Sequence, residues 1–218
     1  MEHVMKTKQL EVHPEKSCYL LMGQGESLDG IKSDIEAHPL IYDSFKLKNN
    51  NEAKHLGDYI NEGGNEASIM ATIAHRRGQV KRCIFEVGAV LNDIRMQTIG
   101  GITSGLVIWN MAIIPYLLNN SEVWVDSDKT CIDELEKLQT LFLSVLLAVP
   151  VSCARPALAW DTQTLSMENR VAQRKLNFVC HVKRLGEDSL AKQVYQEQIK
   201  HEWPGWTLKS RSYAKLCI

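Results

Sequence analysis

The sequence lacks the spacings of cysteine and histidine that hold metal ions or disulfides. Its six cysteines are widely scattered without a Cys-x-x-Cys pair, and its seven histidines show no His-Glu-x-x-His or comparable ligand spacing. Scattered cysteines are typical of reduced thiols in an intracellular chain. Because the pattern argues against a disulfide framework and a zinc site, we expect an intracellular protein of the cytoplasm or nucleus with no bound metal.

A strong net charge and a membrane-length apolar run are also missing. The 218 residues carry 25 Lys and Arg against 26 Asp and Glu, a net charge of -1. This balance excludes a globally basic nucleic-acid binder but leaves room for a local basic face. Residues 1–9 are polar and unlike a signal peptide. The most apolar window, 102–118, includes Asn110 and Pro115 and falls short of the roughly 20 residues of a membrane span. We expect a buried core helix and no membrane partner.

The glycine, serine and carboxylate motifs of common enzymes do not occur either. The stretch GQGESLDG contains Gly23 and Gly25 without a third glycine in register, and it is typical of a turn rather than a phosphate-binding loop. A Gly-x-Ser-x-Gly nucleophile elbow is absent. Asp126 and Asp128 could contact a cation, but the EF-hand pattern is absent and helix capping explains Asp128. We therefore expect no small-molecule substrate.

Short apolar runs separated by turn residues fill the first 60 residues. Residues 8–23, KQLEVHPEKSCYLLMG, predict a strand–turn–strand hairpin. The runs in 38–48 and 49–60 favour further strands, and 27–38 favours a short helix. We expect a small α+β piece with antiparallel strands over residues 1–62.

From Asn65 onward the apolar residues recur at three- to four-residue steps, which predicts a helix over 65–93. Asn65 is a favourable N-cap residue for this helix. Gly78 and Gly88 lie inside the pattern and argue against an unbroken helix. The Gly100-Gly101 pair is expected to stop it.

The rest of the chain also has helical periodicity. A second helix is predicted over 102–118, kinked or ended near Pro115. Further helices are predicted over about 130–149, 167–185 and 188–202. The fold class is therefore α+β, with a mostly helical body over 63–218.

Two basic clusters are the most suggestive physical feature. Both lie on predicted helices, in the stretches AHRRGQVKR and RVAQRK, and their members are Arg76, Arg77, Lys81, Arg82, Arg170, Arg174 and Lys175. Such clusters can neutralise nucleic-acid phosphates in a salt-dependent way. They can equally be solvated helix faces paired with nearby acidic residues, and the sequence leaves both interpretations open.

Several segments, taken in order, resemble the palm and thumb of non-LTR (LINE-type) retrotransposon reverse transcriptases. LEVHPEKSCYLLMG resembles the hairpin that follows the catalytic aspartate strand, and KHLGDYI resembles the Leu-Gly strand of the primer grip. SIMATIAHRRGQV and GLVIWNMAIIPYLLNNSEVW resemble the thumb, and the likeness continues from LEKLQ to VCHV. The resemblance covers about residues 8–208, and it depends on the collinear order of the segments rather than on a single motif.

The resemblance implies roles for several residues and a nucleic-acid partner. Lys16 would protonate or steady the departing pyrophosphate, and Leu56 and Gly57 would press on the primer end. The cations of the two basic clusters would follow the backbone of an RNA or DNA template–primer duplex. The intact family uses Mg²⁺, held by aspartates that lie upstream of the hairpin.

This sequence departs from the family at the positions that carry catalysis. It contains no Asp-Asp pair, and nothing upstream of Lys16 could supply the metal-binding strands. His13 stands at a turn position that is usually asparagine, and Asp161-Thr162 stands where a Glu-Gly pair is expected. We expect no cofactor in this chain and no polymerase activity, with Lys16 a relic of the general-acid position.

The sequence is therefore interpreted as a truncated C-terminal part of a reverse transcriptase, an RNA-directed DNA polymerase, with a palm remnant over 1–62 and a thumb-like body over 63–218. The alternative is a non-enzymatic helical module derived from the thumb, which binds nucleic acid or protein.

Overall fold

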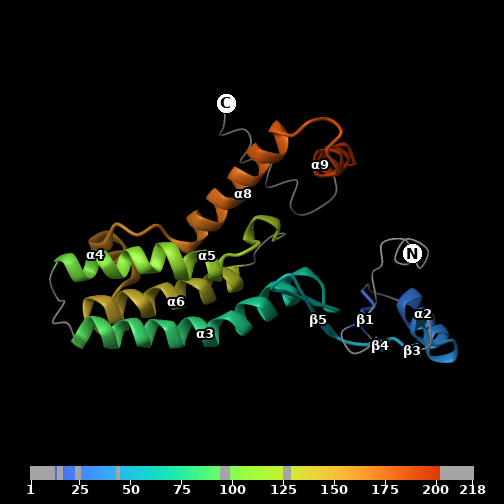
Figure 1. The fold of residues 1–218 in the computed structure, drawn as a ribbon, viewed down its shortest axis with the longest axis horizontal. Coiled ribbons are helices and arrows are strands. Elements are labelled where there is room, and N and C mark those ends of the chain that lie inside the picture. The colour runs from blue at the N-terminus through green and yellow to red at the C-terminus, as the bar shows by residue number, and fades with distance from the viewer. Residues whose placement is uncertain are drawn as a thin grey trace. The chain divides into compact units, whose positions relative to one another are not determined.

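The computed structural model describes residues 13, 17–22, 26–42, 45–93, 99–124 and 129–201 (Figure 1). The chain divides into two compact units, Met1–Ser68 and Ile69–Ile218. Among the described residues, the first unit holds all the strands and the second holds helices alone. The expected α+β class, with a mostly helical second part, is confirmed at this level.

In the described part of the first unit there are one complete helix and three short strand pairs. The helix is α2 (Glu26–Ala37), as expected. β2 (Ile41–Tyr42) and β3 (Phe45–Lys46) pair antiparallel, whereas β1 (Cys18–Tyr19) pairs parallel with β4 (Lys48–Asn49). The prediction of purely antiparallel pairing is therefore wrong for β1. Its partner lies 30 residues later in the chain, and the first arm of the predicted 8–23 hairpin lies outside the described residues.

The hairpin β5 (Glu52–His55) to β6 (Asp58–Asn61) is the longest strand pair in the described part of the first unit. His55 pairs with Asp58, so Leu56 and Gly57 alone form the turn. Both have positive φ, +49° and +91°, which is typical of a type I′ turn whose twist matches the two strands. The sequence prediction that placed Leu56 and Gly57 within a strand is wrong, because the two-residue loop requires the left-handed conformation at both.

Hydrogen bonds around Asn61 fix the exit from this hairpin. The Asn61 side chain accepts from the backbone N–H of Gly63 at 2.9 Å, and the Asn61 N–H donates to the hydroxyl of Ser68 at 2.8 Å. That hydroxyl donates in turn to the carbonyl of Gly64 at 2.6 Å. Gly64 has φ +92°, so the chain reverses there into α3 (Asn65–Asp93).

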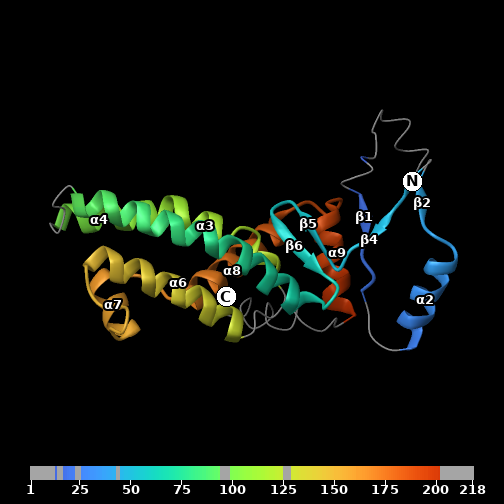
Figure 2. The same cartoon turned by 90° about the horizontal axis from the view of Figure 1, so that it is seen from below.

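The second unit is built on three helical runs that lie alongside one another (Figures 1 and 2). The first is α3, which confirms the helix predicted over 65–93 and continues without a break through Gly78 and Gly88. The second comprises α4 (Ile99–Ile108), the π-helical turn η1 (Trp109–Ile113) and α5 (Ile114–Leu117), and the third is α6 (Lys129–Leu147). Gly100 and Gly101 lie inside α4, so this pair does not stop a helix as expected. Residues 94–98 lie outside the described residues.

The remaining elements complete the helical unit. They are the 3₁₀ turn η2 (Ser121–Val123), α7 (Arg155–Thr162), α8 (Met167–Arg184) and α9 (Leu190–Lys200). The last two match the helices predicted over 167–185 and 188–202. α8 packs against η2, α6 and α9.

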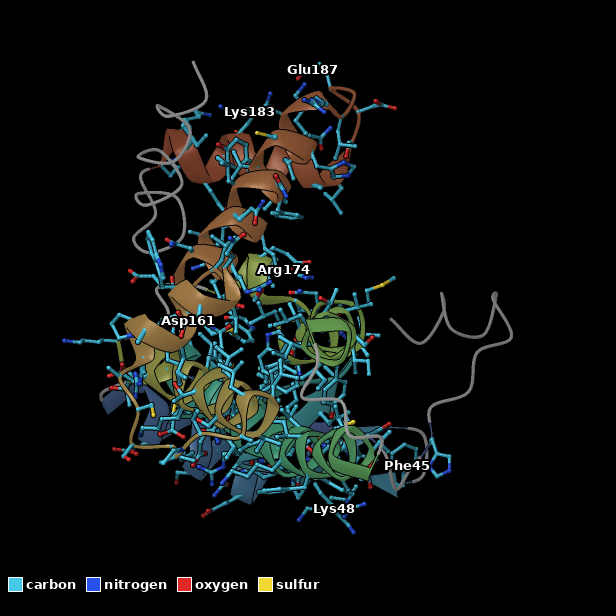
Figure 3. The ribbon with its side chains drawn as sticks, turned by 90° about the vertical axis from the view of Figure 1, so that its left-hand side faces the viewer. Phe45, Lys48, Asp161, Arg174, Lys183 and Glu187 are labelled. Carbon is cyan, nitrogen blue, oxygen red and sulfur yellow. The ribbon has the colours of Figure 1, made fainter. Side chains whose placement is uncertain are left out.

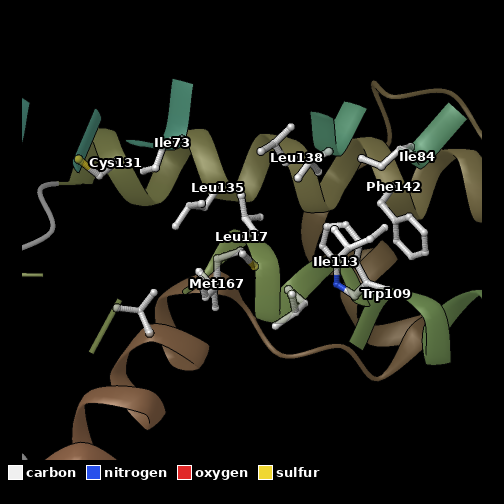
Figure 4. Close-up of a cluster of buried hydrophobic side chains, with 14 of the residues drawn as sticks. Ile73, Ile84, Trp109, Ile113, Leu117, Cys131, Leu135, Leu138, Phe142 and Met167 are labelled. Atoms are coloured by element: carbon white, nitrogen blue, oxygen red, sulfur yellow. The ribbon is translucent and has the colours of Figure 1, made fainter. Parts of the chain in front are cut away.

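The hydrophobic core lies where the three helical runs meet (Figure 4). The indole of Trp109 stacks on the ring of Phe142 with centroids 4.4 Å apart and planes 14° from parallel. Ile73 and Ile84 of α3 and Leu135 of α6 are at least 99% buried. Burying side chains of this size contributes about 1.5–3 kcal/mol each, so this cluster is the main source of stability in the unit.

The helix over 99–117 changes its winding just before Pro115, as the sequence predicted for that position. Proline has no N–H and its ring crowds the carbonyl four residues earlier, so an α-helical bond is lost there. In η1 the N–H of Ile114 instead donates to the carbonyl of Trp109, a π-type bond across five residues. Trp109, Ile113 and Leu117 are all buried on either side of this change.

Candidate nucleic-acid interface

The basic cluster of α3 is divided between the interior and the surface. Arg77 and Lys81 lie four residues apart, one turn along the same flank of the helix. Lys81 and Arg82 are exposed to solvent. Arg76 lies on the opposite flank and is only 2% exposed. The expectation that all four cations share one exposed face is therefore wrong for Arg76.

Arg76 has a structural position at the end of α5. Its Nη1 donates to the carbonyl of Leu117 at 3.1 Å and to the carbonyl of Asn119 at 3.0 Å. Carbonyls at a helix C-terminus lack partners within the helix and carry partial negative charge. A buried cation is stable at such a place, so the guanidinium is committed to the fold and is not available to a phosphate.

Arg77 belongs to a small charge network between α3 and α6. Its guanidinium lies 3.2 Å from Glu134, which Lys137 also contacts at 2.5 Å. The hydrogen bond from Lys137, together with the charges of Lys137 and Arg77, lowers the pKa of the Glu134 carboxyl below its ordinary value. Arg77 remains about half exposed, so it can still contribute to an external basic surface, although Glu134 offsets part of its charge.

The basic cluster of α8 is used mostly within the fold. Arg170 donates to the carbonyl of Leu165 at 3.3 Å and to Asn110 Oδ1 at 2.9 Å. Burial lowers the pKa of its guanidinium from the ordinary value, against an opposing effect of Glu136. The prediction of an external basic face on α8 is wrong in this respect, because the first of its three cations binds protein groups.

Arg174 and Lys175 extend the same pattern. Arg174 lies midway along α8 (Figure 3), where its Nε is 3.3 Å from Glu122 of η2. Lys175 is only 8% exposed. Arg76, Arg170 and Arg174 thus each bind a group in the segment 110–122 and hold that segment in place. Arg170 also binds the carbonyl of Leu165, close to the start of α8.

Two exposed cations that sequence reasoning missed lie at the end of α8. Lys183 and Arg184 occupy its last turn, with Lys183 near the end of the helix in Figure 3. Cations in the last turn of a helix are stabilised by the negative end of its dipole. The preference for basic residues in the last turn of a helix is the sequence signal that could have identified these two cations. It indicates helix capping as readily as a binding surface.

The structure describes only some of the residues that were expected to act in catalysis or at a primer end. Leu56 is 81% exposed at the tip of the β5–β6 hairpin, beside Gly57. Lys16 lies outside the described residues. In the part of the chain that the structure describes, no group of three or more His, Cys, Asp and Glu side chains could hold a metal ion.

One helical segment among the described residues passes a length and composition test for a membrane span. It is Gly100–Leu117, with a mean hydropathy of 1.3, and 33% of it is buried in the structure. Because its buried residues include Trp109 and Leu117 of the hydrophobic core, the segment acts here as a core helix.

Comparisons with protein-family models, curated proteins and solved structures found no match to this chain. The resemblance to reverse transcriptases therefore depends on the sequence segments alone.

Proposed function

We propose that this chain is a helical nucleic-acid-binding module that contacts the phosphate backbone of a duplex. The observation that carries the proposal is the position of Lys81 and Arg82, which are exposed neighbours on the long helix α3, one turn after the half-exposed Arg77. A helix that presents cations on successive turns suits a regular row of phosphates, and such contacts need no base-specific groups.

The proposal agrees with the resemblance to a reverse transcriptase thumb, which would lie along a template–primer duplex. It involves no catalysis by this chain, because two-metal nucleotidyl transfer requires a carboxylate set and the sequence has no Asp-Asp pair. We therefore expect the purified chain to bind a primer–template duplex without extending the primer in Mg²⁺ or Mn²⁺.

A salt titration tests the proposed contacts. Binding of a fluorescent RNA–DNA primer–template is measured by anisotropy at several salt concentrations, for the wild-type chain and for Lys81→Ala/Arg82→Ala. Each phosphate contact contributes about -0.9 to the slope of log K against log salt. Loss of two contacts should therefore make the slope shallower by about two, whatever the sequence of the duplex.

A matched control removes the same charge from another helix. Lys183→Ala/Arg184→Ala also loses two exposed cations, at the end of α8. If both double variants change the slope equally, binding depends on net charge and α3 has no special role. If the wild-type chain does not bind the duplex even at low salt, the proposal is wrong.

A specific observation favours protein binding as the second candidate. An apolar cavity of about 430 Å³ lies between η2, α8 and α9. Phe178, Val182 and Val194 contribute to its lining, and Leu190 beside them is 74% exposed. Apolar grooves between two helices are recurrent docking sites for amphipathic helices. A chain that binds no duplex but retains this cavity would fit the protein-binding alternative.

A further inference from the structure

The helix over 99–117 and the turn that follows it carry no charge. Residues 99–121 contain no Asp, Glu, Lys, Arg or His, although charged residues make up 23% of the whole chain. Surface helices of monomeric proteins usually carry charged side chains on their outer face. The composition of this segment is therefore unusual for a helix with a solvent-facing side.

The outer face of this helix is both apolar and exposed. Trp109, Ile113 and Leu117 point into the core. On the outer side, Val107 is 49% exposed and Met111, one turn later, is 76% exposed. The outer side chains run along the helix as a stripe, which we call the 107–116 face: Val107, Ile108, Met111, Ala112 and Tyr116. Contiguous exposed apolar surface of this kind marks an interaction site.

The surroundings of the 107–116 face disfavour a lipid bilayer as the occupant. Asn110 lies in the same stretch of helix, and its Oδ1 accepts a hydrogen bond from Arg170 at 2.9 Å. Inserting the face into hydrocarbon would bring this guanidinium toward the membrane, at a substantial energetic cost. The occupant is therefore expected to be protein.

Charge complementarity favours a second copy of the same chain. A two-fold interface places the same patch on both partners, so any charge on the patch meets a like charge near the axis. A face without charge has no such repulsion. Ala112 and the exposed Thr103 and Ser104 are small, so two such helices can approach closely. We propose that the chain forms a homodimer through the 107–116 face.

The oligomeric state of the full chain tests this proposal. Sedimentation equilibrium from micromolar to millimolar concentration should show the mass rising from 24.7 kDa toward twice that value. Met111→Glu places a charge at the most exposed position of the face and should weaken association about a hundredfold, because like charges then meet across the axis. Circular dichroism checks that the variant is folded.

Val90→Glu is the matched control, since Val90 on α3 is also an exposed apolar helical residue, 57% exposed against 76% for Met111. It should leave the dissociation constant unchanged. A wild-type chain that stays monomeric throughout the range overturns the proposal, including the case in which another part of the chain covers the face. A dimer that tolerates Met111→Glu, or that Val90→Glu dissociates equally, has its contact elsewhere and also overturns the proposal.

Discussion

Two glycines inside α3 should respond in opposite ways to the same substitution. A Cβ added at Gly78 meets no heavy atom within 4 Å. A Cβ added at Gly88 lies far inside the contact distance of Val145 Cγ1 on α6, while Val145 Cβ remains at an ordinary 3.9 Å. Alanine at either position gains the same helix propensity, so the difference between the two variants reports the packing of α3 against α6 alone.

The magnitudes follow from these two environments. Replacing glycine by alanine within a helix stabilises it by about 1 kcal/mol, which is the full expected effect of Gly78→Ala. At Gly88 the gain is offset by overpacking, which costs about 1–3 kcal/mol. Val145 is β-branched and stiff about χ1 in a helix, so its methyl does not rotate away freely. Gly88→Ala should therefore be less stable than Gly78→Ala by about 1–3 kcal/mol.

Urea unfolding followed by tryptophan fluorescence measures the difference. Trp109 and Trp124 are buried in the core of the second unit, so their fluorescence follows the unfolding of the helical unit. The variant Val145→Ala removes the clashing methyl and provides the internal control. In that background Gly88→Ala should become stabilising, as a double-mutant cycle between contacting residues would show. If Gly88→Ala stabilises the wild-type chain as much as Gly78→Ala does, the close approach of the two helices at this point is refuted.

Two further predictions concern the charges of the second unit. Arg76→Met leaves the carbonyls of Leu117 and Asn119 without this donor and should lower the free energy of unfolding by about 2–3 kcal/mol in urea titrations; a loss under about 0.5 kcal/mol would contradict the structural role of Arg76. Because the folded-state pKa of Glu134 is lowered, mainly by Lys137, its contribution to stability is present above the unfolded pKa of about 4.3 and disappears as the pH falls through the lowered value. The wild type should therefore lose more stability than Glu134→Gln on acidification below pH about 4.3, and identical pH profiles for the two proteins would contradict this network.

The helical body could be predicted because its signal is local and periodic. Apolar spacing located α8 and α9 to within a few residues, and proline chemistry located the change of winding before Pro115. Gly88 was misread because its reason lies in another helix. A sequence pattern counts glycine as a helix breaker, but α6 approaches so closely there that a larger side chain does not fit.

The candidate interface was harder to predict, since the sequence around a basic residue does not show which group that residue binds in the fold. Arg76 and Arg77 are neighbours in the chain, yet one binds carbonyls in the interior and the other faces Glu134 and solvent. Arg174 binds Glu122, 52 residues away, which no local pattern reveals. The prediction of antiparallel pairing failed for β1 for the same reason, because β1 pairs in parallel with a strand 30 residues later in the chain.

The π-helical turn at 109–113 also determines how this segment can change length. The π-type bond from Ile114 to Trp109 spans five residues, whereas an α-helical bond spans four, so this turn contains one extra residue while Trp109 and Ile113 both lie on the core side. Deleting one residue within 110–112 would remove the extra residue and restore ordinary α-helical winding, with α4 and α5 in the same register. Trp109 would then keep its stack on Phe142. The segment can thus lose one residue at this turn without moving its buried side chains away from the core.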